Sequence, residues 1–119
     1  MKSLAYYCVL VVAGLHIIFM IIELTLWDTD FGRRLSRLSP TASRETKNIG
    51  LNPALYNGFL GFGLFWATFA LSGFDAWSVQ RVFLSFIAGM GVVGAIWLRN
   101  PGIFLLQALP AMIALGLSW

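Results

Sequence analysis

Charged side chains are scarce in this sequence of 119 residues. Aspartate, glutamate, lysine and arginine together make up 11% of the chain, whereas an ordinary globular domain carries roughly 25%. A water-soluble fold of this size would need a polar surface, and too few polar groups are available to cover one. Hydrophobic residues reach 59%, and the mean hydropathy is +0.81. The composition therefore predicts an integral membrane protein.

Cysteine and histidine are each present once, as Cys8 and His16. A single cysteine excludes an intrachain disulfide and a metal site built on several thiolates. One histidine with scattered carboxylates does not make a zinc or haem site, so we expect no metal and no cofactor. The net charge of +3 comes with no aromatic and basic interleaving, and we expect no nucleic acid partner.

Long apolar runs divide the chain into segments that could each cross a bilayer. A helix needs about 20 apolar residues to span the hydrocarbon core. The sequence predicts an all-α fold, a four-transmembrane-helix bundle formed by a single domain over residues 1–119. The expected spans cover about residues 4–27, 53–72, 76–98 and 101–118.

Local signals mark where these helices begin. Asn52 and Asn100 are each followed by proline, and an asparagine N-cap before a proline at the first helical position is a favourable helix start. Asp75 is expected to cap the third span.

Small residues predict where the helices pack closely, because helices in lipid associate through close backbone approach. We expect packing faces at two sets of small residues, which are Gly58, Gly61 and Gly63 in the second span, and the pairs Ser85 with Gly89 and Gly91 with Ala95 in the third.

Basic residues gather in the loop over residues 28–52, which holds Arg33, Arg34, Arg37, Arg44 and Lys47. Together with Arg99 they outnumber the two on the other side, Lys2 and Arg81. Lysine and arginine favour the cytoplasmic side, so we expect both termini outside and the loop 28–52 in the cytoplasm, against anionic lipid head groups. The expected location is a plasma membrane, namely a bacterial inner membrane.

Within that loop, Phe31, Leu35 and Leu38 are spaced at i, i+4 and i+7. This spacing is typical of a short amphipathic helix that lies on the membrane surface. The alternative is a solvated loop with incidental apolar residues.

Polar residues within the spans are the candidate site, since ionisable groups in hydrocarbon are costly and commonly functional. With a rise of about 1.5 Å per residue, Glu23 and Asn57 each lie about 6 Å inside the cytoplasmic boundary. Gln107 lies about 9 Å inside, and His16 about 16 Å, near the midplane. Glu23, Tyr56, Asn57 and Gln107 thus share one layer, which predicts a ligand-binding pocket open to the cytoplasm with His16 at its floor.

Each candidate also has a simpler explanation. Glu23 could be hydrated or paired with an arginine of the loop, and His16 could hydrogen-bond across helices. Asn57 and Gln107 could hold helices together, and Tyr56 could be an interfacial residue. Glu23 and His16 are the candidate acid–base groups should the protein be an enzyme.

The chain resembles domain-of-unknown-function family 1304, a family of small membrane proteins. The resemblance is carried by His16, Glu23, Leu26–Trp27, Phe31–Gly32–Arg33, Asn52, the run from Leu55 to Leu60, Gln107 and Leu109–Pro110. Pro53 stands where the family usually has glutamine. The resemblance implies a four-helix membrane architecture and no established reaction.

Three functions fit these features. The first is binding or transport of a small or amphipathic solute, with Glu23 exchanging protons for substrate, and so small a bundle would form a homo-oligomer to enclose a path. The second is a membrane enzyme of isomerase, cyclase or epoxide-opening type acting on a lipid-soluble substrate, with the amides orienting it. The third is a structural or accessory subunit.

The orientation can be tested with thiol reagents. A cysteine introduced into the loop 28–52 should resist an impermeant maleimide applied from outside intact cells, and it should react once the cells are opened. Reaction in intact cells would reverse the assigned topology.

Overall fold

The computed structural model describes residues 2–119, and the side chains of residues 3–119. This part of the chain contains helices and no strand, which confirms the expected all-α class. The elements are α1 (Lys2–Thr25), α2 (Asp30–Ser36), α3 (Pro40–Glu45), α4 (Leu51–Phe69), α5 (Gly73–Trp97), α6 (Pro101–Ile103), the π-helix η1 (Phe104–Ala108) and α7 (Leu109–Leu117).

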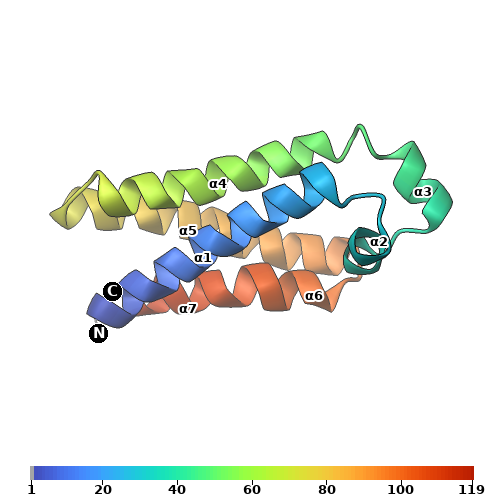
Figure 1. Ribbon diagram of the computed structural model, residues 1–119. Helices are drawn as coiled ribbons and strands as arrows, with labels where there is room; N and C mark the ends of the chain where they lie inside the picture. Colours follow the sequence, from blue (N-terminus) through green and yellow to red (C-terminus); the bar gives the residue numbers. More distant parts are fainter. Residues whose placement is uncertain (1) are drawn as a thin grey trace.

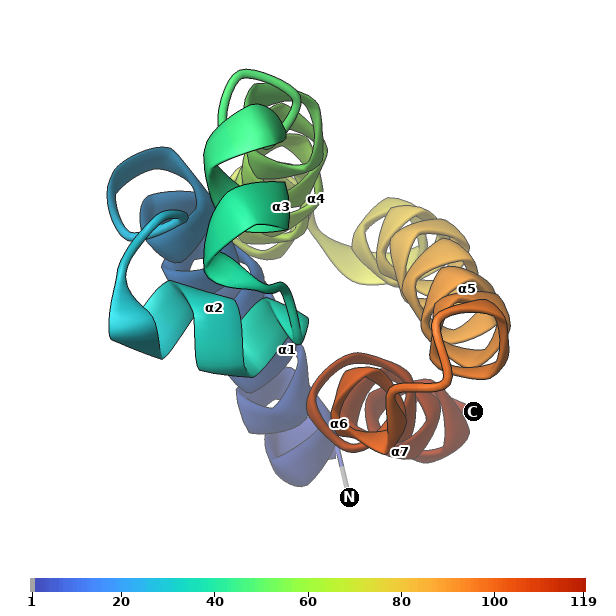
Figure 2. The same cartoon turned by 90° about the vertical axis from the view of Figure 1, so that its right-hand side faces the viewer.

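The long helices lie side by side in an elongated molecule of 48 × 25 × 17 Å (Figure 1). Viewed from the end, α1, α4, α5 and the continuous run from α6 to α7 surround a common centre (Figure 2). The short helices α2 and α3 cover one end, and both termini lie at the other. Two of the described helices, Ser3–Thr25 and Gly73–Trp97, are long and apolar enough to cross a membrane.

The apolar core occupies the middle of the molecule and the half that holds the termini. Its buried members come from α1, α4, α5 and α7, and they include Val9, Val12, Leu64, Leu84, Ile87, Ala111 and Ala114. Small alanines alternate with larger residues, which lets the helices approach closely. The half covered by α2 and α3 is not part of this core.

Glycines bring the helices together, as the sequence predicted for most of them. A Cβ atom added to Gly61 would lie 2.9 Å from the carbonyl oxygen of Ala13, so α4 and α1 meet there almost backbone to backbone. On α5, a Cβ at Gly91 would lie 2.7 Å from the backbone nitrogen of Ala108. The pair Ser85 and Gly89 is exposed instead, so its predicted packing role is wrong within this chain.

The helix starts follow the sequence in one case and depart from it in two. Asn100 caps α6 as expected, because its Oδ1 accepts a hydrogen bond from the backbone N–H of Gly102 at 3.1 Å. Asn52 is not a cap, because α4 begins at Leu51, two residues before Pro53, and Gly50 is the residue that precedes it. Backbone hydrogen bonds from Thr46 onward lead into this earlier start. Asp75 lies inside the first turn of α5, which begins at Gly73 in a left-handed conformation (φ +60°) that favours glycine.

Two glycines two residues apart on α5 give a matched test of the packing. Gly91→Ala should lower the free energy of unfolding by about 1–3 kcal/mol, because the new methyl group meets the backbone of η1. Gly89→Ala should be neutral or stabilising by up to about 1 kcal/mol, because nothing lies within 4 Å of its added Cβ. The measurement is thermal unfolding in detergent, and equal stability of the two variants would contradict the packing described here.

Candidate functional site

A cavity of about 470 Å³ lies between the long helices at the end covered by α2 and α3. Its wall is mostly apolar, with Glu23, Asn57 and Gln107 contributed by α1, α4 and η1. The lining also includes Phe19, Ile22, Trp27, Leu35, Leu38, Ile49, Asn100, Ile103 and Leu106. An apolar cavity with a few converging polar groups is the usual form of a small-molecule site.

Glu23 and Asn57 form the polar centre of this wall. The Asn57 side-chain Nδ2 donates a hydrogen bond of 2.8 Å to Oε2 of Glu23, from α4 to α1. Asn57 directly precedes Gly58, which lies against Met20 of α1, and the short reach of an asparagine suffices because the two helices are so close. Both side chains are partly buried. The Asn57 amide therefore holds α1 and α4 together, which was the simpler explanation for this residue. It also lines the cavity.

Gln107 reaches the cavity from a π-helical turn. The Leu109 backbone N–H donates to the carbonyl of Phe104, five residues back, in place of the ordinary four. Pro110 follows and has no N–H to offer the carbonyl four residues before it, and a wider turn is a common adjustment in such a place. Within the described residues the Gln107 amide makes no side-chain hydrogen bond, so it stays available to a ligand.

His16 does not form the floor of the cavity. Its ring is fully buried, and Nδ1 lies 2.9 Å from the carbonyl oxygen of Val12 in its own helix. Nε2 has no hydrogen-bond partner among the described residues. The ring packs edge-on against Phe19, with 5.6 Å between centroids, and only Phe19 lines the cavity. His16 therefore supports the wall from behind, and the predicted floor position is wrong.

Tyr56 also lies away from the cavity, with 69% of the residue exposed on the outer face of α4. Successive residues on an α-helix differ by about 100° in direction. Because Asn57 points inward, its neighbour must point elsewhere. The structure thus brings Glu23, Asn57 and Gln107 to one cavity and leaves Tyr56 and His16 out, while ligand binding there stays a prediction.

The mouth of the cavity is formed by residues that sequence reasoning assigned elsewhere. Leu35 and Leu38 line the cavity, so the expected membrane-surface stripe is wrong for both. A short helix does form in this loop, as the spacing of the apolar residues predicted, but α2 ends at Ser36. Arg37 then takes a left-handed conformation (φ 58°) that redirects the chain. Phe31 alone stays on the outside.

Two hydrogen bonds tie α2 to the turn between α5 and α6. The Arg37 guanidinium donates to the carbonyl oxygen of Arg99 at 3.0 Å, and the Asn100 side-chain amide donates to that of Leu35 at 3.5 Å. Residues far apart in the sequence therefore meet across the mouth. In this region the sequence predicted only that Asn100 caps a helix. A capping signal does not indicate that the Asn100 side chain also reaches the carbonyl of Leu35.

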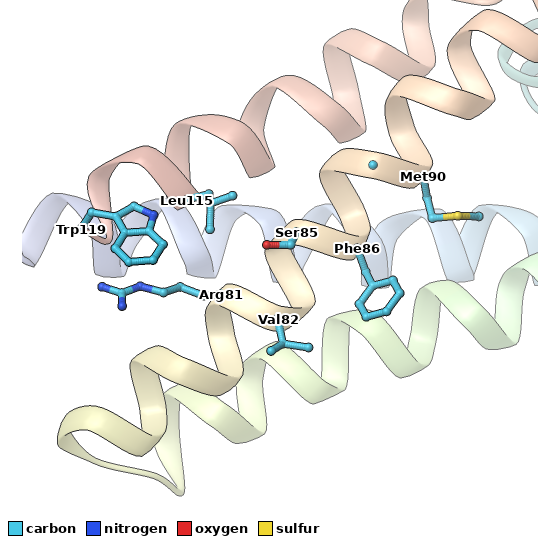
Figure 3. Close-up of a pocket in the computed structure, with 8 residues that line it drawn as sticks. Arg81, Val82, Ser85, Phe86, Met90, Leu115 and Trp119 are labelled. Atoms are coloured by element: carbon cyan, nitrogen blue, oxygen red, sulfur yellow. The ribbon is translucent and has the colours of Figure 1, made fainter.

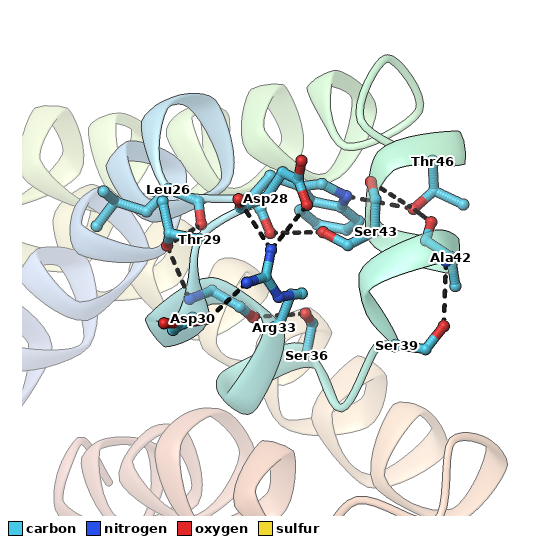
Figure 4. A network of polar contacts seen from close by, with 12 residues as sticks. Leu26, Asp28, Thr29, Asp30, Arg33, Ser36, Ser39, Ala42, Ser43 and Thr46 are labelled. Carbon is cyan, nitrogen blue, oxygen red and sulfur yellow. Dashed lines mark hydrogen bonds and ion pairs between the residues drawn. The ribbon is translucent and has the colours of Figure 1, made fainter.

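A polar network fixes the loop that precedes α2 (Figure 4). The Arg33 guanidinium donates to Asp28 at 3.0 Å and pairs with Asp30, so Arg33 does not pair with Glu23. The Ser43 hydroxyl donates to the backbone carbonyl of Trp27 at 3.0 Å, which fastens α3 to the end of α1. Partial desolvation tends to raise the pKa of Asp28, but the hydrogen bond from Arg33 and the positive charges of Arg33 and Arg44 lower it.

A second hollow, of about 530 Å³, is a groove on the outside between α5 and α7 (Figure 3). Arg81 lies at one end, with its guanidinium carbon 4.1 Å from the centre of the Trp119 ring. It also donates to the Ser118 hydroxyl at 3.2 Å and to the Ser118 carbonyl. The Arg81 guanidinium, the only charged side chain of the groove lining among the described residues, already has these partners, so the first cavity is the better candidate.

Comparison with known proteins gives a match for almost the whole chain. Residues 10–119 match the model of a family described as "Protein of unknown function (DUF1304)". Every residue that lines the cavity falls within this range. No curated protein and no solved structure matches.

The lowered pKa of Asp28 predicts how stability depends on pH. A depressed folded-state pKa means that the stabilisation is present above the ordinary aspartate pKa of about 4 and is lost as the pH falls through the lower, folded value. The thermal midpoint of the wild type should therefore fall toward that of Asp28→Asn as the pH falls from about 5 through the ordinary aspartate pKa of about 4 and on through the lower, folded value. Asp75→Asn, at the far end of the molecule, is the control and should run parallel to the wild type. A constant gap between wild type and Asp28→Asn would contradict the assignment.

Proposed function

Because this chain belongs to the DUF1304 family, whose description names no activity, we propose a function from the cavity itself. The protein is an integral membrane protein that binds a small amphipathic solute between its helices, as the binding step of storage or transport. The observation that carries this proposal is the meeting of Glu23, Asn57 and Gln107, from three helices, in one mostly apolar cavity.

In this proposal all four helical stretches cross the bilayer. A rise of about 1.5 Å per residue gives α4, with 19 residues, a length of about 28 Å, close to the hydrocarbon thickness of about 30 Å. Large apolar side chains on the outer face of α4 are exposed, namely Phe59, Phe62, Trp66 and Phe69. Contact with lipid would cover them. The run Pro101–Leu117 is a shorter apolar helix and would be the fourth span.

The proposed orientation puts the cavity mouth on the cytoplasmic side, with both termini outside. The arrangement of α2 and α3 at one end and both termini at the other supports an even number of crossings. Basic residues of the loop 28–52 lie at the mouth end, where anionic head groups of the inner leaflet would attract them. A solute would enter from the cytoplasm or from the head-group region of that leaflet.

The packed core limits what the cavity can do in this conformation. Val12, Leu64, Leu84 and Ile87 belong to the buried core beyond the cavity, so within the part of the chain that the structure describes this core closes the way to the other end. Transport would need a second conformation or a second copy of the chain. Binding needs neither, and it is therefore the function that the geometry supports best.

Two positions on α2 provide a matched test. Leu35 lines the cavity and is 38% exposed, whereas Phe31 is 55% exposed and does not line it. With protein in lipid nanodiscs, 1-octanol at about 100 times its Kd should stabilise the wild type by about 2.7 kcal/mol. Leu35→Trp fills the mouth and should abolish this thermal shift, while Phe31→Trp should retain it. Equal shifts in both variants would show that the alcohol acts through the bilayer and would refute the proposal.

A further inference from the structure

The charges around the cavity allow the class of ligand to be narrowed. Glu23 is the one ionisable side chain among the described residues of the lining, which holds no lysine, arginine or histidine. The cavity therefore carries at most one formal charge, and that charge is negative.

No basic side chain of the described residues neutralises Glu23. The two ion pairs formed in that part of the chain both belong to Arg33, with Asp28 and Asp30. Arg37, at the mouth, donates to a backbone carbonyl instead. The hydrogen bond that Glu23 does receive comes from the neutral amide of Asn57. A carboxylate in a half-buried, apolar setting gains most from a cation.

Two aromatic residues, Phe19 and Trp27, line the cavity together with Glu23. Phe19 and Glu23 are four residues apart in α1, the spacing that places two side chains on one face of a helix. Trp27 lies just beyond the end of α1 and is held by a hydrogen bond from its Nε1 to the Thr46 hydroxyl, 3.2 Å long. Aromatic faces attract organic ammonium groups, most strongly where water is excluded.

From this geometry we infer that the ligand is a monovalent organic cation, an amine or ammonium compound with an apolar body. Its nitrogen would lie against Glu23 between Phe19 and Trp27, with the Gln107 amide facing it. The body would pack among Ile22, Ile103 and Leu106. This inference rests on the proposed function, because it requires the same cavity to bind a solute.

The test compares octylammonium with 1-octanol, which have the same chain and differ in charge at neutral pH. Protein is placed in nanodiscs of uncharged phosphatidylcholine, so that the bilayer surface does not concentrate the cation. Glu23→Gln should weaken octylammonium binding about 10- to 100-fold, the value of a charge-assisted hydrogen bond, and change octanol binding less than about threefold. Glu45→Gln, on the exposed surface of α3, is the control and should change neither affinity.

A second measurement needs no variant and so does not depend on whether Glu23→Gln folds. In the wild type, octylammonium should bind most tightly, 1-octanol less tightly and octyl sulfate least. Two results would overturn the cationic ligand while leaving the binding cavity intact. One is an affinity for 1-octanol equal to or higher than that for octylammonium, and the other is an unchanged affinity of Glu23→Gln for octylammonium. If all three probes bind Leu35→Trp as well as they bind the wild type, the cavity is refuted as a binding site.

Discussion

The close approach of α1 and α4 is the contact on which the candidate site depends. Gly61 leaves no room for a side chain beside the Ala13 carbonyl, whereas Gly58 faces the flexible side chain of Met20. Because the two backbones are so near at Gly61, the short side chain of Asn57 can span the gap to Glu23. A larger residue at Gly61 would separate the helices and leave both polar groups without a partner in an apolar setting, which is costly.

The remaining wall depends on a second close contact, between α5 and the π-helical turn. Gly91 meets the backbone of Ala108, and the residue before Ala108 is Gln107. The wider turn ahead of Pro110 thus brings an amide to the cavity at the point where the helix is fixed against its neighbour. Three residues contribute to this part of the wall. Pro110 alters the backbone hydrogen bonding, Gly91 allows the close approach of α5, and Gln107 supplies the side-chain amide that faces the cavity.

The loop end shows why part of the site lay beyond sequence reasoning. Helical spacing of Phe31, Leu35 and Leu38 suggested one continuous apolar stripe on the membrane surface, but α2 ends at Ser36, before Leu38. Leu35 and Leu38 both line the cavity, whereas Phe31 does not. Trp27 packs against Gly50 and donates a hydrogen bond to the Thr46 hydroxyl, nineteen residues further along the chain. Such outcomes depend on contacts between residues far apart in the chain, and no local pattern encodes them.

The sequence by itself determined the helical class, the approximate positions of the long helices and the Asn100 cap, because propensity and capping are local properties. It also selected Glu23, Asn57 and Gln107 as residues of one layer. The direction in which each of them points was decided by the tertiary structure. Tyr56 lies on α4 beside Asn57, and His16 lies on α1 two turns before Glu23, yet neither lines the cavity. Only the packing of the helices decides this, because the rotation of a helix about its axis is set by its neighbours.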